Sequence, residues 1–422
     1  MSYEFLIGLR YLRSKRKSTS ISIITFISMA GVALGVMALI VVLAVMTGFE
    51  EDLKEKILGT NAHVVVLKNN GGIEGYTGVM DRLKRVPGVV AATPFVYSQV
   101  MLTTGSNVSG VVLRGIEPKS DARVTNLKKS LVEGRLTDLE KTVASGTEGT
   151  PLPGVILGKE LAKNLNLFVG DPVNIVSPLG NITPFGMAPK MKRFRVAGLF
   201  NTGMLEYDST LAYIGLREAQ EFLGLGTAVT GIQLKVADVY HADRIARDIN
   251  RGFGYEYFAR DWMRMNKNFL FALKTEKMVM FIILTLIVLV AAFGIASTLF
   301  MVVMEKTKDI AILKSMGATN RSIMKIFVLE GLIIGVAGTV VGVLSGLLVA
   351  LNLESIVAFI QKVTGFELFS RDVYYLDHFP SQVVPGDVLL ISLTAVLISF
   401  AATLYPSWQG SRLPPTEALR YE

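Results

Sequence analysis

Residue types that could do catalytic chemistry are few in this sequence and lie far apart. The three histidines, His63, His241 and His378, form no H-E-x-x-H motif, so a zinc site is not expected. There is no cysteine, and no G-x-S-x-G or G-x-x-x-x-G-K-[ST] motif occurs. The sequence therefore predicts a protein that is not an enzyme, with no catalytic residue, no metal and no cofactor bound by the chain itself.

A charged segment, Glu305 to Arg321 (EKTKDIAILKSMGATNR), is the next group of residues that could act together. It separates two apolar runs, Met278–Met304 and Gly331–Leu353, which contain no charged residue. Each run is long enough to cross a bilayer core of about 30 Å as a helix. The segment is therefore predicted to be a charged island between two spanning helices.

The island has the period of a short amphipathic helix. Ile310, Leu313 and Gly317 fall on one face, with Ile312 and Met316 beside it. Asp309 lies in the first turn and Lys314 further on, as the helix dipole favours, and Gly317 can end the helix. On pattern alone, an ordinary positively charged loop is the simpler interpretation. The alternative is a lever at the membrane surface that passes force from a soluble partner into the membrane.

Composition and charge placement indicate a membrane protein. The chain has 422 residues, is 51% hydrophobic and has a mean hydropathy of +0.46, which is too apolar for an average soluble protein. The net charge is +8, and Lys and Arg cluster at the N-terminus and in the island, whereas the segment 354–387 holds two basic and five acidic residues. This placement argues against nucleic-acid binding and predicts that both termini and the island are cytoplasmic.

The expected architecture is four transmembrane α-helices with one large α+β domain inserted between the first and the second. Strand and helix patterns occur in mixed order in the domain, which favours α+β over a doubly wound sheet. Strands are predicted at 63–67, 95–103, 108–115, 172–176, 194–200, 210–213 and 231–236, and helices at 78–86, 158–165, 216–223, 239–252 and 260–271, the last continuing into the second span. The predicted segments are an interfacial N-terminal helix (1–20), transmembrane helix 1 (21–49), the outer domain (50–273), transmembrane helix 2 (274–304), the island (305–321), transmembrane helix 3 (322–353), an outer loop (354–386), transmembrane helix 4 (387–409) and a cytoplasmic tail (410–422).

One segment of the outer domain, Ser177 to Arg193, is long for a connection between two strands. Pro178, Pro184 and Pro189 stiffen it and keep it out of a central sheet ladder. Its apolar side chains lie among turn formers. Two interpretations are equally open: a docking finger, or a loop packed on its own domain.

Small residues on the spanning helices predict close helix packing. They are Gly31, Gly35, Gly331, Gly335 and Gly342. A second stripe, at the outer end of the first span, predicts either bundle packing, which periodicity favours, or a wall of an apolar cavity. It consists of Val42, Met46, Phe49 and Leu53. Glu330 is expected to anchor the third span by reaching water rather than to relay protons.

Several motifs resemble known families. The island string E-K-x-x-x-I-A-I-L-K-x-M-G-A is similar to the coupling helix of ABC permeases of the FtsX/MacB/Lol superfamily. Together with IGLRYLRSK, VALGVMALIVVLAVMTGFE and LYPSWQGSRLPPTEALRYE, it resembles the lipoprotein-releasing permeases, the LolC/LolE family, over essentially the full chain. This resemblance implies a MacB/FtsX-like permease of the type VII ABC fold.

The resemblance also implies a function and partners. The expected function is to extract outer-membrane lipoproteins from the bacterial inner membrane and pass them to a periplasmic chaperone. A separate ATPase that binds ATP and Mg²⁺ would drive this release. The expected partners are two copies of a LolD-like ATPase, a second permease (LolE-like, or another copy of this chain), a LolA-like chaperone, an acylated lipoprotein and membrane lipids. The outer domain would then be periplasmic.

Three groups of residues take roles from the same resemblance. Coupling to the ATPase falls on Glu305, Lys306, Asp309, Ile310, Leu313, Met316 and Gly317. A LolC-type hook for the chaperone falls on Ile182, Thr183, Pro184, Phe185, Gly186 and Met187. The lipoprotein cavity falls on Val42, Met46, Phe49 and Leu53.

Two alternatives to lipoprotein release are open. The first is a MacB-like or FtsX-like mechanotransmitting permease, which would share the island but lack the Pro-Phe finger and this tail. The second is a membrane-anchored periplasmic sensor, which would need a cytoplasmic signalling domain.

Overall fold

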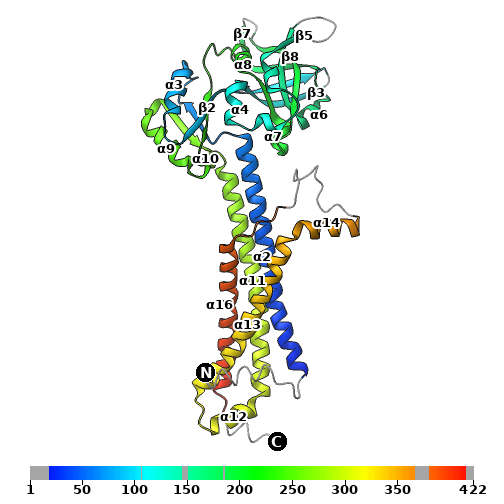
Figure 1. Cartoon of the computed structure of the whole chain (residues 1–422), viewed down its shortest axis with the longest axis vertical. Coiled ribbons are helices and arrows are strands. Elements are labelled where there is room, and N and C mark those ends of the chain that lie inside the picture. Colours follow the sequence, from blue (N-terminus) through cyan, green and yellow to red (C-terminus); the bar gives the residue numbers. More distant parts are fainter. Residues whose placement is uncertain (1–18, 106, 145–150, 184–185, 366–379, 415–422) are drawn as a thin grey trace. The chain divides into compact units, whose positions relative to one another are not determined.

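The computed structural model describes residues 19–105, 107–144, 151–183, 186–365 and 380–414 (Figure 1). Its contacts divide the chain into a helical unit (1–52, 271–369 and 377–422) and a sheet unit (53–270 and 370–376). Among the described residues, four helices are long and apolar enough to cross a membrane. They are α2 (Thr19–Thr60), α11 (Lys267–Glu305), α13 (Asn320–Leu351) and α16 (Pro385–Ser411).

The sheet unit contains one mixed sheet, as the predicted α+β class requires. Its path is β11-β1-β10-β2-β3-β9-β6-β8-β4, β5 pairs with β6, and β7 pairs with β2 and β8. The β3–β9 and β6–β8 pairs are parallel. The strands are β1 (Val64–Lys68), β2 (Val89–Thr104), β3 (Asn107–Ile116), β4 (Leu131–Gly134), β5 (Thr142–Ala144), β6 (Pro151–Gly158), β7 (Pro172–Thr183), β8 (Gly186–Phe200), β9 (Leu211–Gly215), β10 (Gly231–Val236) and β11 (Tyr257–Asp261).

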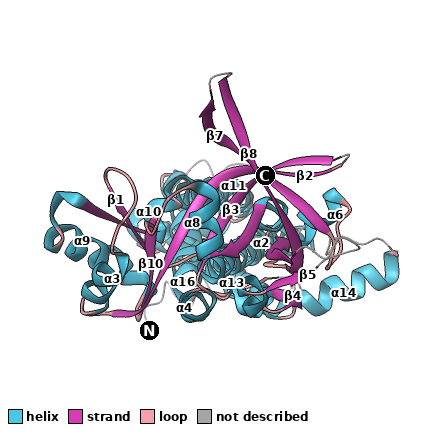
Figure 2. Ribbon diagram, turned by 90° about the horizontal axis from the view of Figure 1, so that it is seen from above, coloured by secondary structure: helices cyan, strands magenta, loops and turns pink. Residues whose placement is uncertain are grey.

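Short helices connect and cover these strands (Figure 2). They are α3 (Tyr76–Lys84), α4 (Pro118–Val124), α5 (Leu127–Ser130), η1 (Leu136–Glu140), α6 (Lys159–Leu165), α7 (Leu205–Thr210), α8 (Leu216–Leu223), η2 (Val239–His241), α9 (Ala242–Gly252), η3 (Gly254–Glu256) and α10 (Trp262–Met265). The fit is close where α8 crosses β3, because a Cβ on Gly115 would lie 2.3 Å from the Cβ of Ala219.

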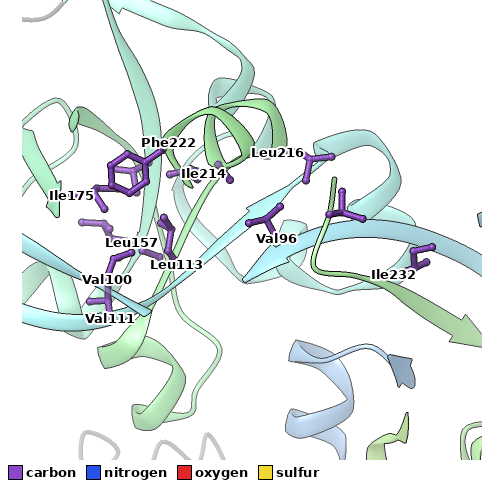
Figure 3. Packing of buried hydrophobic residues seen from close by; sticks show 14 of the residues in the cluster. Val96, Val100, Val111, Leu113, Leu157, Ile175, Ile214, Leu216, Phe222 and Ile232 are labelled. Carbon is purple, nitrogen blue, oxygen red and sulfur yellow. The ribbon is translucent and has the colours of Figure 1, made fainter. Parts of the chain in front are cut away.

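The core of the sheet unit lies between the sheet and these helices (Figure 3). Val100, Val111 and Leu113 from β2 and β3 are almost fully buried in it, and Phe222 from α8 belongs to the same cluster. Phe194 of β8 meets Phe222 edge to face, with ring centroids 6.3 Å apart. Burial of such β-branched and aromatic side chains stabilises the unit without a disulfide.

Several segments differ from the sequence-based expectation. The strands β4, β5, β6 and β11 lie where the sequence predicts no strand. Arg260 and Asp261, expected in a helix, instead pair with β1 in β11. Asp261 then ends the strand by accepting a hydrogen bond from the Arg264 backbone N–H at 3.0 Å, which caps α10. The helix predicted over 260–271 is therefore divided into α10 and the start of α11.

The long connection of residues 177–193 is a β-ladder rather than a loop. Its two strands, β7 and β8, stay paired on both sides of an irregularity between Ser177 and Asn181. Pro178 and Pro189 fall at this irregularity, because proline has no N–H to donate to a ladder. Figure 2 shows β7 and β8 projecting from the sheet as a two-stranded ribbon.

The helical unit packs through the glycines of α13. A Cβ on Gly342 would lie 2.7 Å from the carbonyl oxygen of Ala33 in α2, and one on Gly331 would lie 2.2 Å from the side chain of Thr403 in α16. Gly335 approaches Ser399 of α16 in the same way. Gly31 and Gly35 of α2 lie against Ala291 and Val288 of α11. Contacts this close exclude larger residues at these positions of α13.

Two details of the helical unit differ from expectation. Glu330, expected to reach water, is only 4% exposed, and its Oε2 has no hydrogen-bond partner among the described residues. The outer loop predicted over 354–386 begins with a helix, α14 (Leu353–Thr364), before residues that lie outside the described part of the chain.

Asp121 of α4 makes the stability of the sheet unit depend on pH. The side chain is 1% exposed and accepts a hydrogen bond from Thr125 Oγ1 at 2.7 Å. Burial raises its pKa from 3.8 to about 6. Because the pKa is higher in the folded than in the unfolded state, this carboxyl lowers stability progressively as the pH rises from about 4 to about 6, and the loss persists above that.

We therefore expect Asp121→Asn to remove this decline, because asparagine does not titrate. The fold should be kept, since the amide oxygen can still accept the hydrogen bond from Thr125. The free energy of unfolding of the sheet unit should rise at pH 7 by on the order of 2–3 kcal/mol. Urea midpoints of the sheet-unit transition between pH 4 and pH 8 measure it, and Asp81→Asn at an exposed site is the control. An unchanged pH slope in the Asp121 variant would contradict the assignment.

Candidate functional site

The charged island forms a short helix, α12 (Thr307–Ser315). Asp309 in its first turn pairs with Lys306 at 3.4 Å. The helix ends at Ser315, and Gly317 two residues later has a φ of +100°. Ala318 N–H donates to Leu313 O at 2.9 Å and Gly317 N–H donates to Lys314 O at 3.0 Å, which is a Schellman stop. Thr319 then caps α13 by accepting from Ser322 N–H at 3.2 Å. The turn into the next span is therefore tightly defined.

One face of α12 packs on the spans of its own unit. Ile310 and Ala311 are each 1% exposed, and Leu313 packs on the same apolar cluster. Lys314 lies on this side too. Its Nζ donates to the backbone oxygens of Ser411 at 2.6 Å and Leu413 at 2.8 Å. These carbonyls lie at the end of α16, where they have no donor within the helix. α12 is thus fastened to α16 as well as to its chain neighbours.

The other face of α12 presents apolar side chains to the surroundings. Ile312 is 49% exposed and Met316 is 80% exposed. Lys308 and Ser315 are exposed beside them. These four positions share one side of a helix, since Ile312 follows Lys308 by four residues, and Ser315 and Met316 follow Ile312 by three and four. A helix at the end of a span that presents two large apolar side chains next to a lysine is suited to dock into a groove of another protein.

A cavity lies near the outer end of the spans. It has a volume of about 490 Å³ and is lined by Leu43 of α2, Phe271, Met278 and Phe281 of α11, and Leu390 of α16, among others. Its polar groups include Lys277, whose Nζ lies 2.9 Å from Asp387 Oδ2 and 3.1 Å from Thr47 Oγ1. The cavity therefore combines apolar walls with an internally paired charge.

A second cavity, of about 1160 Å³, lies beside α8 in the sheet unit. Two acidic side chains of its lining form ion pairs with Lys192: Glu218 at 2.7 Å and Glu221 at 3.5 Å. Across the described residues, no group of three or more His, Asp or Glu side chains is placed to hold a metal ion.

Comparisons with known proteins cover the whole chain. Residues 25–251 match the MacB-like periplasmic core domain, and residues 281–415 match the FtsX-like permease C-terminal domain. The lipoprotein-releasing system transmembrane protein LolC of Neisseria meningitidis serogroup B is 39% identical over 100% of both chains. The chain belongs to the LolC/LolE family of lipoprotein-releasing system transmembrane proteins.

Two further relatives support the same family. LolC of Xylella fastidiosa is 38% identical over 99% of this chain and 98% of the relative. LolE of Haemophilus influenzae is 31% identical over 99% of both chains. The family and the four spanning helices make this a membrane protein with a periplasmic domain, and they confirm the MacB/FtsX-like fold expected from the sequence.

The structure places the residues expected to couple to an ATPase on both sides of α12. Glu305, Met316 and Gly317 are exposed, and Lys306 and Asp309 are half-buried. Ile310, however, is buried against the spanning helices of its own chain, so it cannot contact a partner. Ile312 takes its place on the outward face. Sequence periodicity missed this because both sides of α12 carry apolar residues.

Lys314 is the second residue whose role the sequence did not reveal. Its partners follow it by 97 and 99 residues in the chain. The only local signal is a cation late in a short helix, which the helix dipole already explains.

Four of the six residues expected to form the chaperone hook lie at the end of the β7–β8 ribbon. Ile182 pairs with Met187 and Thr183 pairs with Gly186 across the ladder. Pro184 and Phe185 lie outside the described residues. The hook assignment therefore stays a prediction.

The stripe expected to line a lipoprotein cavity lies along α2. Its four side chains, Val42, Met46, Phe49 and Leu53, are all half-buried in the single chain. The first three belong to the helical unit and the last to the sheet unit. The α2 residue that lines the 490 Å³ cavity is Leu43, adjacent to the stripe in sequence.

Proposed function

We propose that this chain is the permease subunit of a transporter that releases lipoproteins from the bacterial inner membrane. The observation that carries the proposal is the 39% identity, over both full lengths, to a lipoprotein-releasing system LolC protein. In this proposal the chain has no catalytic role. An ATPase subunit hydrolyses ATP, and the permease converts the resulting movement into expulsion of an acylated cargo.

The proposed input is α12. Both termini and α12 are cytoplasmic in this proposal, which agrees with the cluster of basic residues at the N-terminus and in the island. Two ATPase subunits dock on α12 of this chain and on that of a second permease, of LolE type or another copy of this chain. The exposed pair Ile312 and Met316 supplies the apolar contact. Lys314 passes the movement to α16.

The proposed output is the apolar region at the outer ends of the spans. Removing acyl chains from lipid costs about 0.8 kcal/mol for each CH₂, so apolar walls must replace the lipid. The Val42–Met46–Phe49 stripe and the adjacent cavity at Leu43, Met278 and Leu390 offer such walls. Narrowing of the bundle then transfers the cargo toward the periplasm.

Reconstitution tests this function. The chain is co-purified with its ATPase and second permease, placed in liposomes with a triacylated lipoprotein, and given ATP and a LolA-type chaperone. ATP-dependent appearance of a soluble lipoprotein–chaperone complex supports the proposal. Absence of release, with co-purification of a peptidoglycan hydrolase instead, supports the FtsX-like alternative. Activity without any ATPase supports neither permease reading.

The end of the β7–β8 ribbon, where Ile182 pairs with Met187 and Thr183 with Gly186, is the proposed contact for the chaperone. We expect Phe185→Asp to abolish chaperone capture, because a carboxylate would have to enter an apolar contact without a partner. Pro184→Gly should weaken capture by loosening the tip. Pull-down with immobilised chaperone measures both.

The matched control is Phe168→Asp, which makes the same change at a side chain that is 68% exposed elsewhere in the sheet unit. ATPase assembly should be unaffected in all three variants. Chaperone capture by the Phe185 variant at the wild-type level would remove the hook assignment.

A further inference from the structure

The helix α14 carries an apolar face that the described residues leave exposed or half-buried. At 100° per residue, its large apolar side chains occupy an arc of roughly 160°. No residue of α14 is buried, and Phe359 and Val363 are 67% and 68% exposed. The apolar arc consists of Leu353, Ile356, Val357, Phe359, Ile360 and Val363, and the opposite side of Glu354, Ser355, Ala358, Gln361 and Lys362.

The start of α14 lies at a membrane boundary. Lys277 is the last charged residue before the apolar run of α11, and Asp387 is the last before that of α16. These two side chains pair at 2.9 Å, so they mark one level of the helical unit.

Backbone contacts bring α13 to the same level. Gln382 N–H donates to Ala44 O of α2 at 2.9 Å, and Ser381 Oγ donates to Ala350 O of α13 at 2.9 Å. The span α13 ends at Leu351, and α14 begins two residues later. The helix α14 therefore starts where the spans leave the hydrocarbon.

The axis of α14 runs across the axis of α13. In Figures 1 and 2 it leaves the end of α13 sideways instead of continuing its axis. A helix that turns sideways at this level runs within the plane of the membrane surface. The backbone groups in the middle of α14 are paired within the helix, and those at its two ends can be hydrated at the membrane surface, so the helix can lie in the interface.

We propose that α14 is an interfacial helix whose apolar arc lies in the acyl chains of the leaflet opposite to the α12 end of α13. The occupant of this face is the lipid bilayer. α14 is continuous with a span, so it meets this apolar phase without an association step. With one acid and one base, Glu354 and Lys362, it offers a protein partner little charge to recognise. In this position α14 fixes the depth of α13, while α12 lies at the other end of the same span.

This inference needs only the membrane setting of the family, and its test does not depend on lipoprotein release. The chain has no cysteine, so single cysteines can be introduced without background. Nitroxide labels are placed at Ile356, Ile360 and Val363 on the arc, and at Glu354 and Lys362 opposite. The full chain, assembled with its ATPase and second permease, is held in nanodiscs of phosphatidylethanolamine and phosphatidylglycerol. Power-saturation EPR then gives collision rates with O₂ and with a water-soluble nickel chelate.

We expect the O₂-to-nickel collision ratio to be at least about fivefold higher on the arc than opposite it, because O₂ concentrates in hydrocarbon. A label at Val290, 69% exposed in the middle of α11, is the lipid reference, and one at Tyr255, 98% exposed in the sheet unit, is the water reference. Nickel access to both sides, as at Tyr255, would overturn the proposal in favour of a water-exposed helix. Arc positions shielded from both reagents would overturn it in favour of a protein partner.

Discussion

Replacing Ile312 and Met316 together by glutamate is expected to detach the ATPase subunit from the permease. These side chains are 49% and 80% exposed and form the apolar outward face of α12. Burying two unpaired carboxylates in a partner's groove costs on the order of several kcal/mol each unless they protonate, which weakens binding by roughly a hundredfold or more. Co-purification of the ATPase with the tagged permease from detergent measures the effect.

Two further variants make this test specific. Leu205→Glu introduces the same charge at a side chain that is 51% exposed in the sheet unit, and it should retain the ATPase. Ile310→Ala removes buried apolar atoms from the inward face, so it should lower thermal stability without detaching the ATPase. Retention of the ATPase by the Ile312/Met316 double variant at wild-type stoichiometry would show that α12 is not the docking helix.

Lys314→Met is expected to uncouple ATP hydrolysis from lipoprotein release. Methionine approximates the length of lysine but cannot donate to the oxygens of Ser411 and Leu413, which Nζ contacts at 2.6 and 2.8 Å. Desolvation lowers the pKa of Lys314, so its ammonium relies on these two carbonyls for compensation. Without them, α12 can move while α16 stays behind. Lipoprotein released per ATP hydrolysed should fall about tenfold, as expected from the loss of one or two charge-assisted hydrogen bonds.

The measurement for Lys314 separates coupling from folding. ATPase binding should be unchanged in Lys314→Met, because the side chain lies on the inward side of α12. Lys314→Arg, which keeps donors and charge, should recover part of the released-to-hydrolysed ratio. If Lys314→Met lost release and ATPase binding together, or kept the wild-type ratio, the link between α12 and α16 would not carry the movement.

The contrast between Ile310 and Ile312 shows that the sequence pattern does not predict which side of α12 is free. Both residues are apolar and two positions apart, so they lie on opposite sides of α12. For a helix at a membrane surface, either side can meet an apolar environment, since one faces the spans and the other a protein groove. Only the packing of Ile310 against its own unit distinguishes the two.

Some strands of the sheet unit can be predicted from the sequence and others cannot. β2 and β3 were predicted because their β-branched residues recur along the chain. β11 was not, since its sequence, YFARD, depends on pairing with β1, almost 200 residues earlier. The segment of residues 177–193 carries prolines that indicate a loop, and cross-strand pairing on both sides of them forms a ribbon instead.

The sequence by itself determined the four spans, the inserted α+β domain and the family, because long uncharged apolar runs and full-length motifs are local properties of the chain. It also marked the small residues of α13 and the charged island. Only the tertiary structure decided which face of α12 is free, that Lys314 holds the end of α16, that Glu330 is buried, and that an exposed amphipathic helix follows α13. Each of these depends on how segments pack in three dimensions, and such packing leaves no periodic signal in the residues that make it.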